Sequence, residues 1–118
     1  MSYDIELIDP VTKEPVELNE PHYMRGGTYA LGGSTRAHLN VTYNYAVIFH
    51  RVLGSEGVRT IYGMTGAESI PLLEGAATQL GNDVDPDYWK ATEGNAKRAL
   101  LQLAALAKMR PDAIWAGD

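Results

Sequence analysis

The chain contains no cysteine in its 118 residues. This absence excludes disulfides, thiolate nucleophiles and zinc sites with cysteine ligands. Small extracellular domains usually depend on disulfides, so a domain of this size without any is typical of a reducing compartment. We therefore expect a cytoplasmic protein.

Long hydrophobic runs are also missing. No apolar run approaches the roughly 20 residues that a helix needs to span a bilayer. The first residues, MSYDIELIDP, carry acidic side chains where a signal peptide would carry positive charge. The sequence thus predicts no membrane partner and no export signal.

Positive charge is scarce. Ten Lys and Arg residues stand against fifteen Asp and Glu residues, and the formal net charge is −5. Proteins that bind nucleic acid directly neutralise phosphates with clustered Lys and Arg, so this balance argues against direct nucleic-acid binding. The candidates for a local basic patch are Arg25, Arg36, Arg51 and Arg59.

Recognised nucleotide and metal motifs are absent as well. The glycine pairs match neither G-x-G-x-x-G nor the GK[ST] phosphate loop, and the three histidines have no metal-ligand spacing. Asp83, Asp85 and Asp87 resemble the start of a calcium loop, but Tyr88 and Gly94 stand where that loop needs glycine and glutamate. We expect these aspartates to form a helix-start cluster, and we expect neither a metal nor a cofactor.

The apolar pattern predicts one domain over residues 1–118 with an α+β fold, in which a small antiparallel β-sheet from the N-terminal half packs against three or four helices. Residues 2–18 alternate like a β-hairpin whose return strand begins at Pro15. A short strand over 28–31 would follow. Residues 37–43 alternate again, and this places His38, Asn40 and Thr42 on a polar face opposite Leu39, Val41 and Tyr43.

Apolar stripes of helical period follow these strands. The first helix spans 45–53, with Asn44 as its N-cap and Gly54 at its end. Residues 58–62 form a further short strand or turn. The next helix has two candidate starts and closes at Gly81; the starts are a capping box of Thr65 and Glu68, and Ser69 with Pro71 in the first turn.

The last third of the chain predicts the longest helix. Asp85-Pro86 opens a short turn of helix, and Thr92 then caps the long helix, which Pro111 stops. Ile114 and Trp115 follow it, and we expect them to fold back over the core.

The segment from Tyr23 to Tyr45 has the composition of a binding surface. It contains two Gly-Gly pairs and four of the seven tyrosines. Glycine pairs form tight turns or a backbone cradle for an anion, here beside Arg25 or Arg36. Tyr, Arg and Asn stack on and hydrogen-bond to flat polar molecules. Polar helix starts add further candidate anion sites. The predicted ligand-binding residues are Arg25, Tyr29, Arg36, His38, Asn40, Thr42, Tyr43, Asn44, Tyr62, Thr65 and Glu68.

Four blocks of the chain carry a resemblance: MRGGTY (24–29), LNVTYNY (39–45), IYGMTGAES (61–69) and TEGNAKRALLQLAALAKMRPD (92–112). They resemble small uncharacterised proteins carried by phages and prophages, over most of the chain from about Arg25 onward. The resemblance brings no catalytic residues and no fold. It implies an accessory protein in the cytoplasm of a bacterial host, where such proteins often cover a host protein or sequester a nucleotide signal.

These patterns lead to one main hypothesis and two alternatives. The main hypothesis is a non-enzymatic protein that captures a small anionic, nucleotide-like ligand and forms a homo-oligomer. Arg25 would meet the charge, Asn40, Thr42 and Asn44 would bind polar edges, and Tyr43 or Tyr62 would stack on the ring.

The first alternative is an acidic protein that inhibits a host factor by direct contact. It predicts that the N-terminal acids share one surface: Asp4, Glu6, Asp9, Glu14, Glu17 and Glu20. The second alternative is a small nucleotide hydrolase or transferase that uses His38 or His50, with Glu68 as a partner for either histidine.

Overall fold

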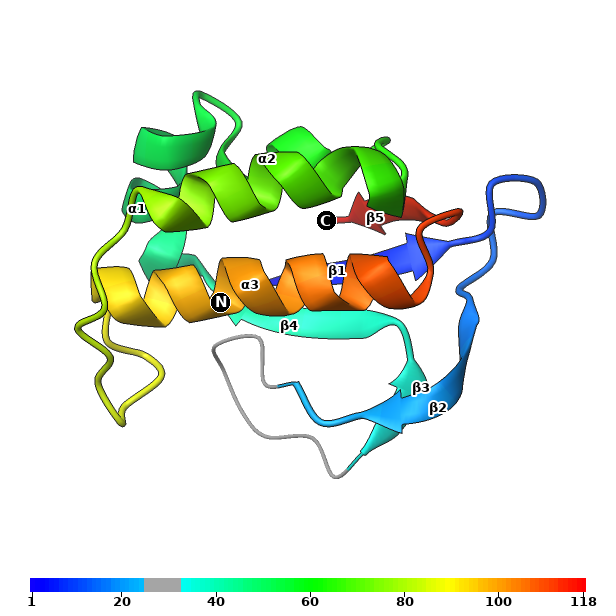
Figure 1. Cartoon of the computed structure of the whole chain (residues 1–118), viewed down its shortest axis with the longest axis horizontal. Coiled ribbons are helices and arrows are strands. Elements are labelled where there is room, and N and C mark those ends of the chain that lie inside the picture. The colour runs from blue at the N-terminus through cyan, green and yellow to red at the C-terminus, as the bar shows by residue number, and fades with distance from the viewer. Residues whose placement is uncertain (25–32) are drawn as a thin grey trace.

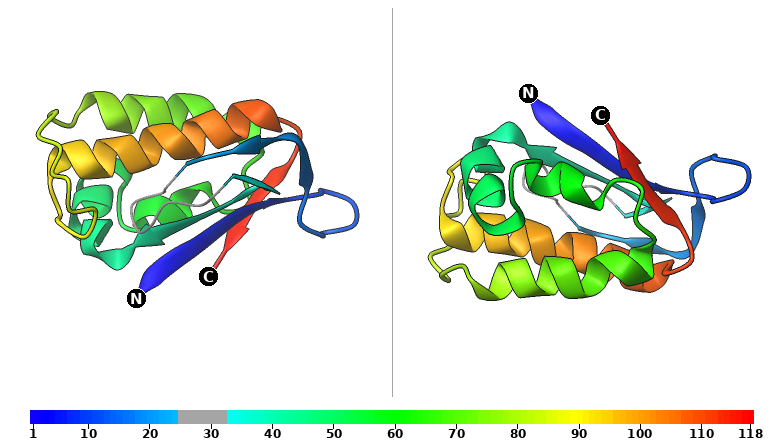
Figure 2. Two further views of the ribbon diagram at one scale, coloured as in Figure 1. Left: turned by 90° about the horizontal axis from the view of Figure 1, so that it is seen from below. Right: turned by 90° about the horizontal axis from the view of Figure 1, so that it is seen from above.

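The computed structural model describes residues 1–24 and 33–118. Its elements form two layers, with a twisted antiparallel sheet on one side and the helices on the other (Figures 1 and 2). The predicted α+β fold is confirmed. In the described part of the chain, no helix is both long and apolar enough to cross a membrane.

Within the described ranges, the main sheet has three strands in the order β4-β1-β5, all antiparallel. β1 spans Ser2–Ile8, β4 spans His38–Thr42 and β5 spans Ile114–Gly117. Alternation in β1 turns Tyr3, Ile5 and Leu7 toward the helices, where all three are buried. No helix of the described residues covers the other face of the sheet (Figure 2).

The hairpin predicted for residues 2–18 forms only in part. After the turn, the chain touches β1 through a bridge between Ile8 and Pro15, and then leaves as β2 (Glu17–His22). β2 pairs instead with β3 (Ser34–Arg36) in a separate two-stranded sheet. The reason is that β4 occupies most of this edge of β1, so the return segment finds free backbone groups only at the end of the strand.

Among the described residues, three α-helices cover the inner face of the sheet: α1 (Ala46–Leu53), α2 (Gly66–Thr78) and α3 (Glu93–Met109). α2 and α3 run antiparallel and side by side (Figure 1). Alanines at their contact allow this close approach, and the buried ones are Ala76, Ala77, Ala96, Ala99, Ala104 and Ala107. Two short 3-10 helices complete the layer, η1 (Tyr43–Tyr45) and η2 (Gly57–Ile61).

Local capping signals place most of the helix ends. Thr65 and Glu68 form the predicted capping box, with hydrogen bonds of 2.9 and 3.1 Å, so α2 starts there. Ser69 is therefore not the cap but a buried residue inside the helix. Thr92 caps α3 by accepting a bond from the Asn95 N–H at 3.0 Å, and α1 ends at Gly54 with a φ of 97°, both as predicted.

Three local predictions are wrong. Thr42, not Asn44, caps the turn before α1: its Oγ1 accepts the Asn44 N–H at 3.2 Å and its side chain is buried. α2 ends at Thr78, before Gly81. No helix forms at Asp85-Pro86 in the described chain. For residues 58–62 the sequence allowed a short strand or a turn, and the turn forms, as part of η2. The predicted strand over 28–31 lies outside the described residues.

Trp115 joins the sheet to α2. β5 pairs with β1 on one side, and on the other side the Trp115 backbone exchanges two bonds of 2.9 Å with Gly63 and Met64. Its ring is 1% exposed, and its Nε1 donates to Ser69 Oγ at 2.7 Å. The return of this segment over the core was predicted, but its role as a sheet strand was not.

Replacing Ser69 with Ala tests this junction. The change leaves the Trp115 Nε1–H buried without an acceptor, so we expect a loss of about 1–3 kcal/mol in the free energy of unfolding. Thr78→Ala is the matched control. The hydroxyls of Ser69 and Thr78 each donate to the carbonyl three residues earlier in α2, but Thr78 is exposed. Its effect should stay within about 0.5 kcal/mol. Urea unfolding measures both, and equal losses would contradict the proposed importance of the bond.

Candidate functional site

Three of the predicted ligand-binding residues lie around a polar hollow on the uncovered face of the sheet. His38 and Asn40 are half-buried on β4, and Arg36 ends β3. Asn40 Nδ2 donates to Asp4 Oδ1 at 2.7 Å, and His38 Nε2 lies 3.4 Å from the same oxygen. The hollow has a volume of about 460 Å³ and is lined by Asp4, Glu6, Arg36, His38, Ala116, Gly117 and Asp118.

The charge of this hollow does not favour an anion. Three carboxylates line it, against the guanidinium of Arg36 and the imidazole of His38. A further anionic group would meet net repulsion from Asp4, Glu6 and Asp118. The His38–Asp4 pair has the arrangement of an oriented base, but no hydroxyl or amine side chain lines the hollow within the described ranges, so it has no such nucleophile to activate.

The remaining predicted residues are dispersed and already engaged. Tyr43 packs edge-on against Tyr3 with ring centres 4.5 Å apart, and Arg59 donates to the Tyr43 hydroxyl at 3.4 Å. Asn44 Nδ2 donates to the Trp89 carbonyl at 2.7 Å. Thr65 and Glu68 bond to each other in the capping box, and Thr42 caps η1.

Tyr62 is the predicted stacking residue that the structure buries most clearly. Its hydroxyl is shielded from solvent against Gly117 of β5. Burial raises the pKa of Tyr62, and the nearby Asp118 raises it further. This environment suits a packed residue better than a ligand-stacking surface. Arg25 and Tyr29 lie outside the described residues.

The histidine pairs and the acidic surface considered from the sequence meet different partners. Glu68 bonds to Thr65, while His50 Nδ1 lies 3.2 Å from the Gly54 carbonyl and His38 lies beside Asp4. The N-terminal acids are divided between two sheets and a turn: Asp4 and Glu6 on β1, Asp9 and Glu14 in the turn, Glu17 and Glu20 on β2.

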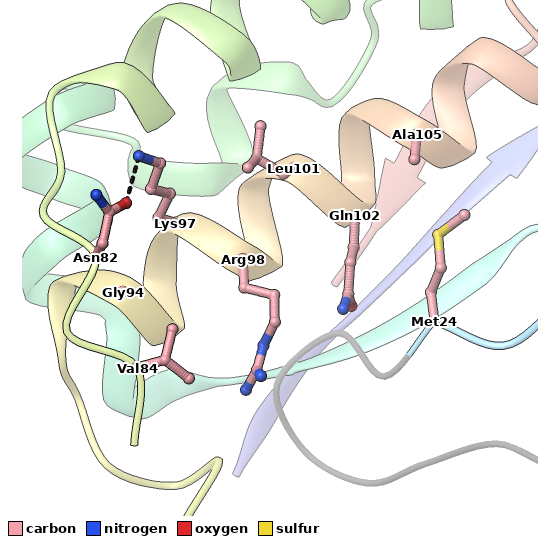
Figure 3. Close-up of a pocket in the computed structure, with 9 residues that line it drawn as sticks. All are labelled: Met24, Asn82, Val84, Gly94, Lys97, Arg98, Leu101, Gln102 and Ala105. Carbon is pink, nitrogen blue, oxygen red and sulfur yellow. Dashed lines mark hydrogen bonds between the residues drawn. The ribbon is translucent and has the colours of Figure 1, made fainter. Parts of the chain in front are cut away.

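A second hollow, the α3 groove, lies along the side of α3 that faces neither α2 nor the sheet (Figure 3). Its volume is about 330 Å³, near the lower end of the range for small-molecule pockets. Its walls come from α3, from the segment before α3 and from Met24, which follows β2. The described lining residues are Met24, Asn82, Val84, Gly94, Lys97, Arg98, Leu101, Gln102 and Ala105.

Gly94 permits the first wall of the groove. A Cβ at this position would lie 2.6 Å from the backbone of Asp83 and Val84, closer than side chains approach backbone. The 82–84 segment can therefore lie directly against the first turn of α3. Asp83 Oδ1 secures it by accepting the Gly94 N–H at 3.1 Å, and Lys97 Nζ donates to Asn82 Oδ1 at 2.8 Å.

Arg98 is the most unusual group in the α3 groove. Its guanidinium carbon lies 5.2 Å from the centre of the Tyr88 ring, an attractive cation–π arrangement. Its Nη2 is shielded from solvent and has no hydrogen-bond acceptor among the residues that the structure describes. A buried N–H donor without an acceptor is costly, so an anionic group that reaches this nitrogen would gain a charge-assisted hydrogen bond.

Asn95 holds the loop that supports Arg98. The side chain is fully buried, and its Nδ2 donates to the carbonyls of Asp87 and Lys90, both at 3.0 Å. Its Oδ1 accepts the Asp85 N–H at 3.0 Å. The Tyr45 hydroxyl donates to the carbonyl of Tyr88 in the same loop. The Tyr88 ring beneath Arg98 is therefore positioned by buried contacts rather than by a free loop.

The aspartates that resembled a calcium loop cap backbone groups instead. Asp83 accepts from Gly94, Asp85 Oδ1 from the Asp87 N–H at 2.9 Å, and Asp87 Oδ1 from the Trp89 N–H at 3.0 Å. In the described ranges, no three His, Asp or Glu side chains form a group that could hold a metal ion.

The sequence contained a signal for the α3 groove that was not used. Gly94, Arg98, Leu101 and Ala105 recur at helical spacing on α3, outside the core stripe. Apart from Arg98 the residues of this stripe are apolar, yet Leu101 is 42% exposed, so no other helix of the described chain covers it. Two adjacent bases at one end of such a stripe are typical of an amphipathic binding surface.

Comparison of the chain with protein-family models, with curated proteins and with solved structures gave no match. The two hollows are therefore distinguished by their own chemistry. The hollow on the sheet is rich in carboxylates, whereas the α3 groove combines apolar walls with two cations.

Glu93 at the start of α3 makes stability depend on pH. It accepts the Gly81 N–H at 2.8 Å and pairs with Arg51 at 2.9 Å, and these contacts lower its pKa. Because the pKa of Glu93 is lowered in the folded state, Glu93 stabilises the fold at pH values above its ordinary pKa of 4.5, and this stabilisation disappears as the pH falls through the lowered pKa.

Glu93→Gln should therefore flatten the loss of stability between neutral pH and the acid range. Urea midpoints measured against pH test this, and parallel curves for the two proteins would refute it.

Proposed function

We propose that this chain is a non-enzymatic binding protein that captures a small anionic, nucleotide-like ligand in the α3 groove. The observation that carries the proposal is the guanidinium of Arg98, which lines the groove, lies over the Tyr88 ring and has one shielded nitrogen, Nη2, without an acceptor among the described residues. A positioned guanidinium of this kind binds phosphate or carboxylate oxygens through charge-assisted hydrogen bonds.

The charge distribution supports selection of an anion. Lys97 and Arg98 line the α3 groove, and no carboxylate does so within the described part of the chain. Acids outnumber bases by fifteen to ten in the whole sequence, so this local arrangement opposes the overall composition. Partial removal of water strengthens the attraction between these cations and a bound anion.

The apolar walls support a ligand with a flat or apolar part. Val84, Leu101, Ala105 and Met24 line the groove around the two cations (Figure 3). Burial of apolar ligand surface contributes roughly 25 cal/mol per Å². A nucleoside phosphate combines a flat ring with a negative group, and the α3 groove offers surfaces for both.

The walls of the α3 groove are held in place by hydrogen bonds, which supports specific binding of a ligand. The Tyr88 loop is held through Asn95, and the 82–84 wall is held through Gly94 and Lys97. Such preorganisation reduces the entropy lost when a ligand binds. Together with the resemblance to phage proteins, it supports sequestration of a nucleotide signal as the biological role, with several copies of the chain acting as a stoichiometric sink.

Replacement of Arg98 tests the proposal. Arg98→Ala should weaken binding of a nucleotide ligand by about 10- to 100-fold, because a hydrogen bond to a charged group contributes roughly 1.5–3 kcal/mol. Arg98→Lys keeps the charge but loses the planar stacking on Tyr88, so its effect should be intermediate. Thermal shift and isothermal titration against a panel of linear and cyclic nucleotides and ADP-ribose provide the measurement.

Two control variants make the result specific. Lys108→Ala removes a base of the same helix that pairs with Glu74 outside the α3 groove, and Arg36→Ala removes the guanidinium of the hollow on the sheet. Both should leave the affinity unchanged. Loss of binding in Arg36→Ala with normal binding in Arg98→Ala would transfer the site to the sheet. Conversion of the bound nucleotide during incubation would contradict a non-enzymatic role.

A further inference from the structure

We infer that the α3 groove selects ligands with a single phosphate group, such as a nucleoside monophosphate or a cyclic mononucleotide, over nucleoside di- and triphosphates. The inference rests on the proposed function and concerns how much negative charge the site accepts. Its basis is the set of acidic side chains in the segment before α3 and in the first turn of α3, next to residues that line the groove.

Acids surround the two cations of the groove. Residues 83–98 contain four acids and three bases, so the segment as a whole is slightly negative although its groove side is positive. Two of the acids have cationic partners: Asp85 lies 3.6 Å from Lys90, and Glu93 lies 2.9 Å from Arg51.

The other two acids are Asp83 and Asp87, and neither has a cation within 4.0 Å in the described ranges. Asp83 bonds to Gly94 at the end of the α3 groove and adjoins Val84 of its wall. Asp87 adjoins Tyr88, on whose ring Arg98 stacks. These two carboxylates therefore balance Lys97 and Arg98 at longer range, and the local excess of positive charge is small.

The donors also suit one phosphate group better than a chain of them. Lys97 extends toward Asn82 and bonds to it, whereas Arg98 extends away from Lys97 in another direction (Figure 3). The two cations thus diverge and do not line a continuous track. A second or third phosphate beyond the one held by Arg98 would lie toward Asp83 or Asp87, where like charges repel.

The volume of the α3 groove points the same way. At about 330 Å³ it lies near the lower limit for small-molecule pockets, which suits one base with one phosphate. A polyphosphate would extend beyond the groove at the acidic end, where it would meet like charge without gaining a cation.

Titration with adenosine, inorganic phosphate, AMP, cyclic AMP, ADP and ATP tests the inference, in chelator without Mg²⁺ so that no metal neutralises the phosphates. We expect AMP or cyclic AMP to bind most tightly, and each added phosphate to weaken binding by about three- to tenfold through like-charge repulsion. The difference should shrink as ionic strength rises, because salt screens these partly exposed charges.

Asp83→Asn and Asp87→Asn identify the cause. Each variant keeps a side-chain oxygen that accepts the bond from Gly94 or Trp89 and removes only the charge. The double variant should raise the affinity for ATP relative to AMP by about tenfold, with an unchanged affinity for adenosine. Matched melting temperatures confirm that the variants fold.

The outcomes separate this inference from the proposed function. Affinity that increases from AMP to ATP, or a ratio that the two Asn variants leave unchanged, overturns the single-phosphate inference while nucleotide capture stands. Absence of binding for every nucleotide in the series, with no difference between the native chain and Arg98→Ala, overturns the proposed function and the inference with it.

Discussion

The arrangement of this fold depends on the burial of Trp115 between three elements. Its backbone pairs with Leu7 of β1 on one side and with Gly63 and Met64 on the other, while its indole N–H bonds to Ser69 inside α2. One residue therefore sets the position of α2 relative to the sheet. α3 packs along α2, so the position of the α3 groove follows from the same contact.

The second constraint is electrostatic. An acidic chain gains solubility from its net charge, and most of its carboxylates are exposed. Around the start of α3, however, the aspartates bond to backbone N–H groups, and Asn95 anchors the loop that carries them. Their positions are fixed by these bonds, which places two bases on the groove side of α3 and the acids at its end. A site for an anion can thus exist in a protein of opposite net charge.

Local rules predicted the parts of the fold that depend on neighbours in the sequence. The capping box of Thr65 and Glu68, the cap at Thr92 and the left-handed Gly54 were all recognisable, because their partners lie within a few residues. Asn44 was assigned wrongly because its hydrogen-bond partner is the carbonyl of Trp89, 45 residues away. The polar face of residues 38–42 was half right: His38 and Asn40 do lie on it, but Thr42 is buried.

The sequence by itself determined the class of the fold, the starts of its two longer helices and the buried face of its first strand, since periodicity and capping act over short distances. Only the tertiary structure decided which strands pair and which polar residues share a hollow. The pairing of β1 with β4 placed Asn40 beside Asp4, and the pairing of β1 with β5, from opposite ends of the chain, brought Asp118 into the same acidic hollow as Asp4. Arg98 lies over the Tyr88 ring because the fold brings the loop that carries Tyr88 against α3. No local sequence pattern encodes the approach of this loop.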